Sequence, residues 1–174
     1  MSVLVAYTSK TGFTKTYAEW IAADLGATLV TTDELTPELI AEHDVIVHGG
    51  GNRAGNLGGL SKFLKLWDEL RGKQVVLWYT GASPENPEAN ARQWEKVLTP
   101  EQCDAAKLFY LRGGFDMGIL RGKDKLMMSG MRSALKLKPN LSPSEQGMLK
   151  MFDNPIRDLD REAVNPLVEY VRAL

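Results

Sequence analysis

The chain has 174 residues, of which 44% are hydrophobic and 25% are charged, and its formal net charge is -1. This length and composition predict one globular domain over residues 1–174 and exclude an intrinsically disordered chain. The near-neutral charge argues against nucleic acid as a partner, and no apolar run reaches the roughly 20 residues of a transmembrane helix. The single cysteine, Cys103, and an N-terminus without a signal-peptide pattern favour a cytoplasmic location.

Strands and helices are predicted to alternate along the first two thirds of the chain. Short apolar runs predict five strands, at Val3–Tyr7, Ala27–Thr31, Asp44–His48, Val75–Tyr79 and Lys107–Leu111. Helical patterns between them lie at about Thr14–Leu25, Thr36–Glu42, Leu57–Leu70 and Pro87–Leu98. Most of the strand runs do not alternate with polar residues, which is typical of strands buried on both faces of a parallel sheet. We therefore expect an α/β fold with helices on both faces of the sheet.

The last third of the chain departs from this alternation. An insert of about fifty residues, at about 112–158, separates the fifth strand from a final helix predicted at about Arg161–Ala173. The insert contains a helical pattern from about Gly122 to Lys138 that is rich in lysine and methionine. A second helix is predicted after Ser142, because Ser142 and Glu145 have the spacing of a capping box.

The segment between the first strand and the first helix has the composition of a phosphate-binding loop. Thr8, Ser9, Thr11 and Thr14 bring four hydroxyl groups, and Gly12 allows the backbone to turn inward. The free N–H groups of the first helical turn attract an anion. The alternative is an ordinary turn in which a threonine caps the helix, but the number of hydroxyl groups exceeds what capping needs. We expect a phosphorylated ligand at this loop.

The same segment, Ser9-Lys10-Thr11-Gly12-Phe13-Thr14, resembles the T/S-x-T-G-x-T phosphate loop of flavodoxins. The strand pattern is similar too, over the first 111 residues and the final helix. The resemblance implies a flavodoxin-like three-layer sandwich whose five-stranded parallel sheet has the order 2-1-3-4-5. Within that superfamily, the insert resembles proteins related to menaquinone-dependent protoporphyrinogen dehydrogenase, through Tyr110-Leu111-Arg112-Gly113-Gly114 and the basic segment from Lys123 to Met128.

Flavodoxin resemblance implies FMN as the cofactor and places its phosphate at Thr8, Ser9, Lys10, Thr11, Gly12, Phe13 and Thr14. The isoalloxazine ring is then implied to lie between the loops after the third and fourth strands. The implied contacts are Gly50, Gly51, Asn52, Arg53, Ala54 and Gly55 in the first loop, Thr80, Gly81, Ala82 and Ser83 in the second, and Gly113 after the fifth strand. Flavodoxins usually place aromatic side chains in these loops. Neither loop has one at its apex here, so we expect a more open ring face.

Structural roles without ligand contact remain as alternatives for several of these residues. The loop after the third strand also fits a flexible surface loop, Arg53 and Asn52 fit solvated surface residues, and Gly113 fits a plain turn. His48 fits a hydrogen-bonded residue at a strand end better than an acid or base. The two histidines lack a cysteine or acidic cluster at metal-binding spacing, so no metal site is expected.

The function implied by the resemblance is electron transfer through FMN, as an oxidoreductase that acts on a porphyrinogen or quinone. Whether the protein is an enzyme stays open, and no catalytic residue is assigned. The alternatives are a simple flavodoxin-type electron shuttle and a flavin-free binding module on the same scaffold. Lys10, Arg53 and Arg112 are all expected near the site, in contrast to the acidic surroundings of electron-transfer flavodoxins.

The basic helix of the insert allows four interpretations. Its lysines can be solvated while its apolar residues pack on the domain. Its methionines can form an adaptable surface over the flavin that receives a quinone, a porphyrin or a redox partner protein. The helix can also contact anionic lipid as a peripheral membrane element, or form a homodimer surface.

Overall fold

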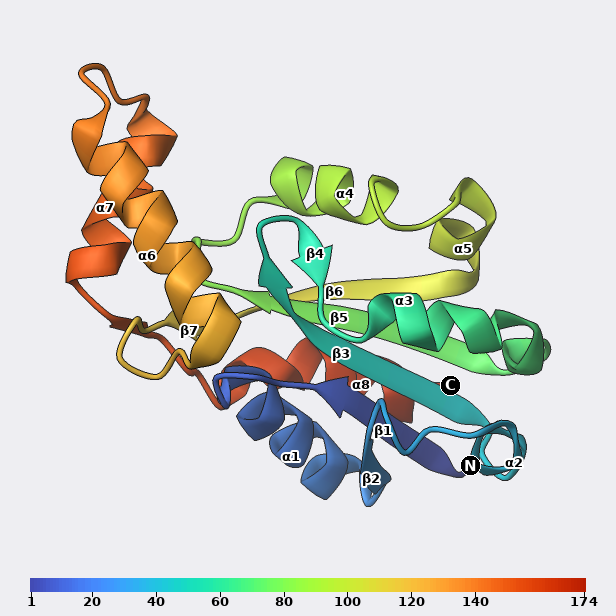
Figure 1. The fold of residues 1–174 in the computed structure, drawn as a ribbon. Coiled ribbons are helices and arrows are strands. Elements are labelled where there is room, and N and C mark those ends of the chain that lie inside the picture. The colour runs from blue at the N-terminus through green and yellow to red at the C-terminus, as the bar shows by residue number, and fades with distance from the viewer.

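The computed structural model describes the backbone of residues 1–174 and the side chains of all of them except Ser144. Five parallel strands form the central sheet (Figure 1): β1 (Val3–Thr8), β2 (Thr28–Thr31), β3 (Val45–Arg53), β5 (Gln74–Gly81) and β6 (Ala106–Arg112). Their order is β2-β1-β3-β5-β6. This confirms the predicted order 2-1-3-4-5, because the remaining strand, β4 (Asn56–Leu57), only extends β3 by a short antiparallel pairing.

Helices cover both faces of the sheet and create two apolar cores. On one face lie α1 (Phe13–Leu25) and α8 (Asn165–Arg172), and on the other α2 (Pro37–Ala41), α3 (Leu60–Phe63), α4 (Pro87–Glu95) and α5 (Pro100–Ala105). Along β5, Val76 and Trp78 belong to the first core, whereas Leu77 and Tyr79 belong to the second. Successive side chains of a strand point to opposite faces, which explains why this run is apolar throughout.

Two predicted helices differ from the structure. The helix predicted at Leu57–Leu70 begins late, because Asn56–Leu57 forms β4, and α3 starts only after Gly59, whose φ is 74°. Residues Leu64–Leu70 continue as a 3-10 helix, η1. The helix predicted at Pro87–Leu98 ends at Glu95, and the unpredicted α5 follows, started by a capping box of Thr99 and Gln102.

The insert is built on a small ribbon of its own. Strands β7 (Gly114–Phe115) and β8 (Ile156–Arg157) pair antiparallel and carry between them α6 (Gly122–Leu137) and α7 (Pro143–Asp153). The predicted capping box of Ser142 and Glu145 starts α7. A 3-10 turn, η2 (Glu162–Val164), then leads into α8. Figure 1 shows α6 and α7 as a hairpin that projects from the end of the sheet where the parallel strands finish.

Salt bridges join parts of the insert to one another. At the ribbon, Arg157 Nη2 lies 2.5 Å from Asp116 Oδ2, and this hydrogen bond keeps the pKa of the Asp116 carboxyl below its ordinary value. Arg132 of α6 pairs with Asp153 of α7, and Lys138 Nζ lies 2.7 Å from Glu145 Oε1 at the hairpin turn. Within the described part of the chain, no helix has the length and apolar character that crossing a membrane requires.

We predict that Gly50→Ala destabilises the protein, because the fold leaves no room for a side chain at the end of β3. A Cβ atom at Gly50 would lie 2.2 Å from the backbone carbonyl oxygen of Gly58. Such overpacking costs about 1–3 kcal/mol of unfolding free energy. The measurement is urea unfolding at equilibrium.

The matched control is Gly130→Ala in the middle of α6, where a Cβ meets no atom within 4 Å. This change should raise the unfolding free energy by about 0.5–1 kcal/mol, since alanine favours the helix. Equal stability of the Gly50→Ala variant and the unmodified protein would contradict the close approach of Gly50 and Gly58.

Candidate functional site

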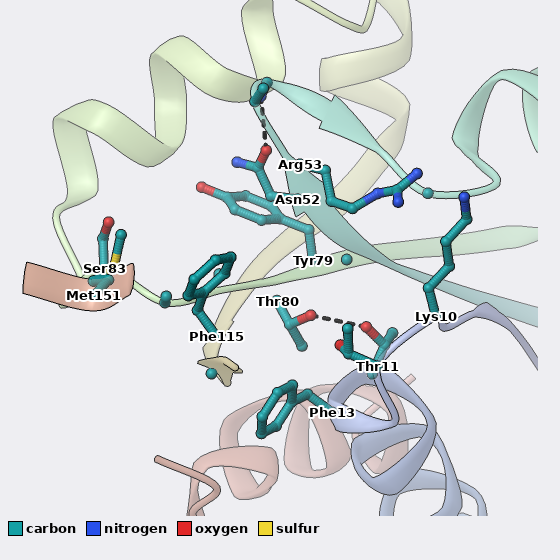
Figure 2. A pocket seen from close by; sticks show the side chains of 18 of the residues that line it. Lys10, Thr11, Phe13, Asn52, Arg53, Tyr79, Thr80, Ser83, Phe115 and Met151 are labelled. Atoms are coloured by element: carbon teal, nitrogen blue, oxygen red, sulfur yellow. Dashed lines mark hydrogen bonds between the residues drawn. The ribbon is translucent and has the colours of Figure 1, made fainter. Parts of the chain in front are cut away.

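A cavity of about 760 Å³ lies at the carboxyl ends of β1, β3 and β5. The loops after these strands line one side of it, and the insert lines the other. The volume falls within the range of about 300–1,000 Å³ that is usual for small-molecule and cofactor sites. Figure 2 shows side chains from both sides pointing into the same space.

The loop after β1 turns sharply before α1 begins. Gly12 is the N-cap of α1 and has a φ of 92°, which favours glycine. Its N–H group donates a hydrogen bond of 3.1 Å to Ser9 Oγ, so the serine hydroxyl stabilises the turn. Thr14 Oγ1 lies 2.8 Å from Thr80 Oγ1, and this buried contact joins the first loop to the end of β5. The first turn of α1 therefore presents its N–H groups and the Thr11 hydroxyl to the cavity.

Hydrogen bonds fix the end of β3 and the turn that joins it to β4. The side-chain oxygen of Asn52 accepts a hydrogen bond of 2.9 Å from the N–H of Gly55. Gln93 of α4 donates one of 2.7 Å to the Gly55 carbonyl oxygen. Ala54 has a φ of 52° at the tip of this turn. These contacts favour an ordered wall of the cavity over the flexible surface loop that the sequence also allowed.

Fourteen of the eighteen predicted binding residues line the cavity. The other four are Ser9, Gly12, Gly50 and Gly113, which support the turns around it. A Cβ atom at Gly113 would approach Thr80 to 3.3 Å and Phe13 to 3.4 Å, so this glycine allows the fifth strand to pass close to the first loop. Contact of any of the eighteen residues with a ligand stays a prediction.

Aromatic side chains line the cavity, although none stands at a loop apex. Tyr79 and Tyr110 come from the strands, Phe115 comes from β7, and Phe152 comes from α7. The ring centroids of Phe115 and Phe152 lie 5.5 Å apart. Sequence reasoning did not assign these residues to the site, because it expected aromatic side chains at the apices of the loops. The position of Phe115, directly after Arg112-Gly113-Gly114, was the one available signal.

Both tyrosines of this wall are neutral and hydrogen-bonded. Burial raises the pKa of Tyr110 to about 12, and its hydroxyl donates to the Ser83 carbonyl oxygen. Burial also raises the pKa of Tyr79, whose hydroxyl donates a bond of 2.7 Å to Asn90 Oδ1. These residues therefore contribute flat surfaces and fixed dipoles to the cavity.

Methionines complete the wall on the insert side. They are Met127 and Met128 of α6 and Met148 and Met151 of α7. In Figure 2, Met151 appears on the opposite side of the view from Lys10. These four methionines thus line the cavity, whereas a partner received by this surface stays a prediction.

A carboxylate of the insert binds both cations of the first two loops. Asp124 Oδ2 lies 3.1 Å from Lys10 Nζ and 2.6 Å from Arg53 Nη1. The hydrogen bond that Asp124 accepts from Lys10 lowers the pKa of its carboxyl group most, and the one from Arg53 lowers it further. The expectation that Arg112 joins these cations is wrong: Arg112 pairs with Asp158 and does not line the cavity.

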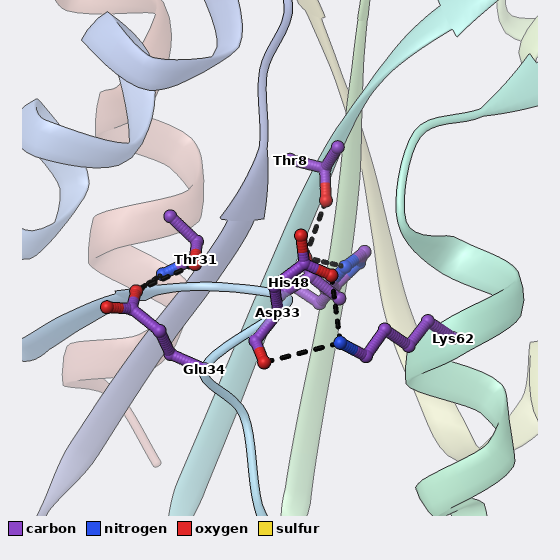
Figure 3. A network of polar contacts seen from close by, with 7 residues as sticks. Thr8, Thr31, Asp33, Glu34, His48 and Lys62 are labelled. Carbon is purple, nitrogen blue, oxygen red and sulfur yellow. Dashed lines mark hydrogen bonds and ion pairs between the residues drawn. The ribbon is translucent and has the colours of Figure 1, made fainter.

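His48 belongs to a buried chain of hydrogen bonds behind the first loop (Figure 3). Thr8 Oγ1 donates to Thr32 Oγ1 over 2.8 Å, and Thr32 Oγ1 lies 3.0 Å from His48 Nε2. The imidazole ring stacks on Phe63. Burial lowers the pKa of His48 to about 3, so the ring is neutral at pH 7. His48 is outside the cavity lining, which favours the hydrogen-bonded structural residue over an acid or base.

Comparison with known families found one match, to the flavodoxin domain, over residues 4–142. No curated protein matches the chain significantly. Among solved structures, the chain is similar to two-electron reduced flavodoxin from Megasphaera elsdenii, with 23% identity, coverage of 63% of this chain and 84% of that one, and a TM-score of 0.47. It is also similar to a flavoprotein in complex with FMN from Lactobacillus acidophilus, with 16% identity, 64% and 92% coverage, and a TM-score of 0.43.

We predict that His48 makes the protein sensitive to mild acid. The unfolded chain takes up a proton at this residue below about pH 6.5, whereas the folded protein does not until about pH 3. Stability from His48 is therefore complete above pH 6.5 and is lost as the pH falls toward 3. Between pH 7 and pH 5 the unfolding free energy should drop by roughly 2 kcal/mol from this residue.

The measurement is urea unfolding at half-unit pH steps, with His48→Gln as the comparison. Because His43 is present in both proteins, the difference between the two pH profiles reports His48 alone. Parallel profiles would contradict a neutral, buried His48.

Proposed function

The chain belongs to the flavodoxin domain family, and we propose that it binds FMN in the cavity at the carboxyl end of its sheet and transfers electrons through it as an oxidoreductase. The observation that carries the proposal is the meeting of three loops in one cavity: the hydroxyl-rich turn before α1 and the loops after β3 and β5. When bound, FMN supplies the oxidation and reduction chemistry, and the protein supplies position and electrostatics.

The first loop fits the phosphate of FMN. Thr11 offers a hydroxyl, Lys10 offers a cation, and the first turn of α1 offers N–H groups with the positive end of the helix dipole. Thr14 already bonds to Thr80, and its hydroxyl is positioned by that bond. No acidic side chain belongs to residues 8–14, and the Asp124 carboxylate beside Lys10 is paired with Lys10 and Arg53.

The remainder of the cavity fits a flat heterocycle. The backbones of residues 51–55 and 80–83 supply polar groups at the ring edge, and the Tyr79 and Phe115 rings supply flat apolar surface. Arg53, the last residue of β3, supplies positive charge that favours a reduced, negatively charged flavin.

The wall of the insert supports a porphyrinogen or a quinone as the electron-exchange partner. Both are flat and largely apolar, and Met127, Met128, Met148 and Met151 form an adaptable apolar surface opposite the loops. A simple electron shuttle needs no such chamber. Turnover of a porphyrinogen with a quinone acceptor favours the dedicated enzyme, and reduction only through a reductase protein favours the shuttle.

Retention of FMN distinguishes the proposed redox protein from a flavin-free binding module. We predict that purified protein retains FMN after desalting and shows flavin bands in its visible absorption spectrum. Thr11→Val should weaken FMN binding about 10- to 100-fold, since it removes a hydrogen bond to a charged phosphate, worth about 1.5–3 kcal/mol. Fluorescence titration of the flavin-free protein gives both dissociation constants.

Riboflavin, which lacks the phosphate, is the internal control. It should bind the Thr11→Val variant and the unmodified protein equally. An equal loss of affinity for FMN and riboflavin in the variant would mean that the phosphate binds elsewhere. If the unmodified protein does not bind FMN, the proposed redox function is wrong.

We also predict that charge at the end of the cavity sets the two-electron potential. Arg53→Ala should lower the potential by roughly 10–30 mV, the two-electron equivalent of about 0.5–1.4 kcal/mol. Asp124→Asn should raise it, because the variant leaves Lys10 and Arg53 without their carboxylate partner. Anaerobic redox titration of the three proteins measures these shifts. An unchanged or higher potential in Arg53→Ala would count against a contact between Arg53 and the flavin.

A further inference from the structure

Helix α6 has an exposed apolar face, and one edge of this face, at Met127, borders the cavity. Leu126 is 76% exposed, Met127 is 49% exposed and Leu137 is 85% exposed. Gly130 and Ala134 are also exposed and lie between them at helical spacing, so these five residues form one stripe. The opposite side of the helix carries Asp124, which faces the site, and the buried Leu135. Lys123 lies within the stripe, and Lys125 and Lys136 lie on the exposed side of the helix beyond Leu126. We call the stripe and these three lysines the outer face of α6.

Positive charge gathers on the hairpin that bears this face. Residues 121–153 contain seven basic and three acidic residues, a net charge of +4. The other residues contain 14 basic and 19 acidic residues, a net charge of -5. All three acidic residues of the hairpin are bound in ion pairs, as Asp124, Glu145 and Asp153. Among the side chains that the structure describes, Lys123, Lys125 and Lys136 take part in no ion pair.

The arrangement of the hairpin exposes this charge to a flat partner. Figure 1 shows α6 and α7 standing clear of the sheet and of the helices that cover it. A surface that touches the outer face of α6 therefore meets the positive hairpin before the negative body. An anionic surface attracts the hairpin and repels the remainder, which orients the molecule.

We propose that the outer face of α6 docks on an anionic lipid surface. Its lysines approach the headgroups, and the Leu126 and Leu137 side chains enter the boundary between headgroups and acyl chains, as in helices that lie in the membrane interface. A second copy of the chain fits less well, because the face carries several lysines and no carboxylate to pair with them. The proposal does not depend on FMN.

Docking in this way brings the site close to the lipid. Met127 belongs both to the outer face and to the lining of the cavity. An apolar molecule dissolved in the bilayer would thus meet the cavity lining at the docking surface itself. This consequence alone rests on the proposed function.

The test is co-sedimentation of the full chain with vesicles of phosphatidylcholine, with and without 30% phosphatidylglycerol. We expect binding to the anionic vesicles, which weakens as the salt concentration rises. The triple variant Lys123→Gln/Lys125→Gln/Lys136→Gln should lose about a hundredfold in partition coefficient, at roughly fivefold for each lysine. Leu126→Ser/Leu137→Ser keeps the charge and should still lose roughly tenfold, since it removes the apolar anchor.

The matched control is Lys65→Gln/Lys96→Gln/Lys107→Gln, which removes three positive charges from exposed positions outside the insert. This control variant should bind the anionic vesicles at least as strongly as the unmodified protein does. Circular dichroism and flavin retention confirm that each variant is folded, so a failure of docking is distinguished from a failure of the flavin site.

Four outcomes would overturn the proposal. Equal losses of vesicle binding in the control and in the lysine variant of the insert would mean that binding depends only on the net charge of the protein. If the leucine variant binds the vesicles as strongly as the unmodified protein, the attraction is a non-specific one to anions. Binding to polyglutamate as strong as binding to the vesicles would mean the same. A dimer in sedimentation velocity that the leucine changes dissolve, without vesicle binding, would assign the face to a second copy.

Discussion

The site depends on one constraint of parallel sheets: every strand must be reached by a crossover connection, so all strands end at the same edge. In this protein that constraint brings together the ends of β1, β3 and β5, which are hydrogen-bonded neighbours in the sheet. The two apolar cores fix the strands on both faces, and the Thr14–Thr80 hydrogen bond then joins two of the three loops at the edge. The loops need little stability of their own because their ends are fixed.

The insert is held in a different way. Its two helices pack on each other, and the hairpin reaches the domain through a two-residue ribbon and through polar contacts. Asp116–Arg157 closes the ribbon, and Asp124 ties α6 to Lys10 and Arg53. Ion pairs at the surface contribute about 0–1 kcal/mol each, much less than an apolar core. The wall of methionines is therefore the less stable side of the cavity, and the loops are the rigid side.

Features with local signals could be predicted from the sequence. The five strands, the phosphate-type loop and the capping box at Ser142 each depend on residues within a few positions of one another. The helix predicted at Leu57–Leu70 begins late because β4 pairs with β3, and no local sequence pattern predicts this pairing. Lys10 and Asp124 are 114 positions apart, and only the folded insert brings them together. Arg112 shows the same limit, since its partner Asp158 lies at the other end of the insert.

Asp124 connects the position of α6 to the electrostatics of the cavity. With the carboxylate in place, Lys10, Arg53 and Asp124 carry a net charge of +1 at the end of the site. A displacement of α6 that separates Asp124 from its partners leaves +2 there, which favours an anionic ligand and the reduced form of a flavin. Any partner that draws the outer face of α6 outward therefore raises the affinity of the site for negative charge. By linkage, negative charge bound in the cavity competes with Asp124 for Lys10 and Arg53, and so loosens the same helix.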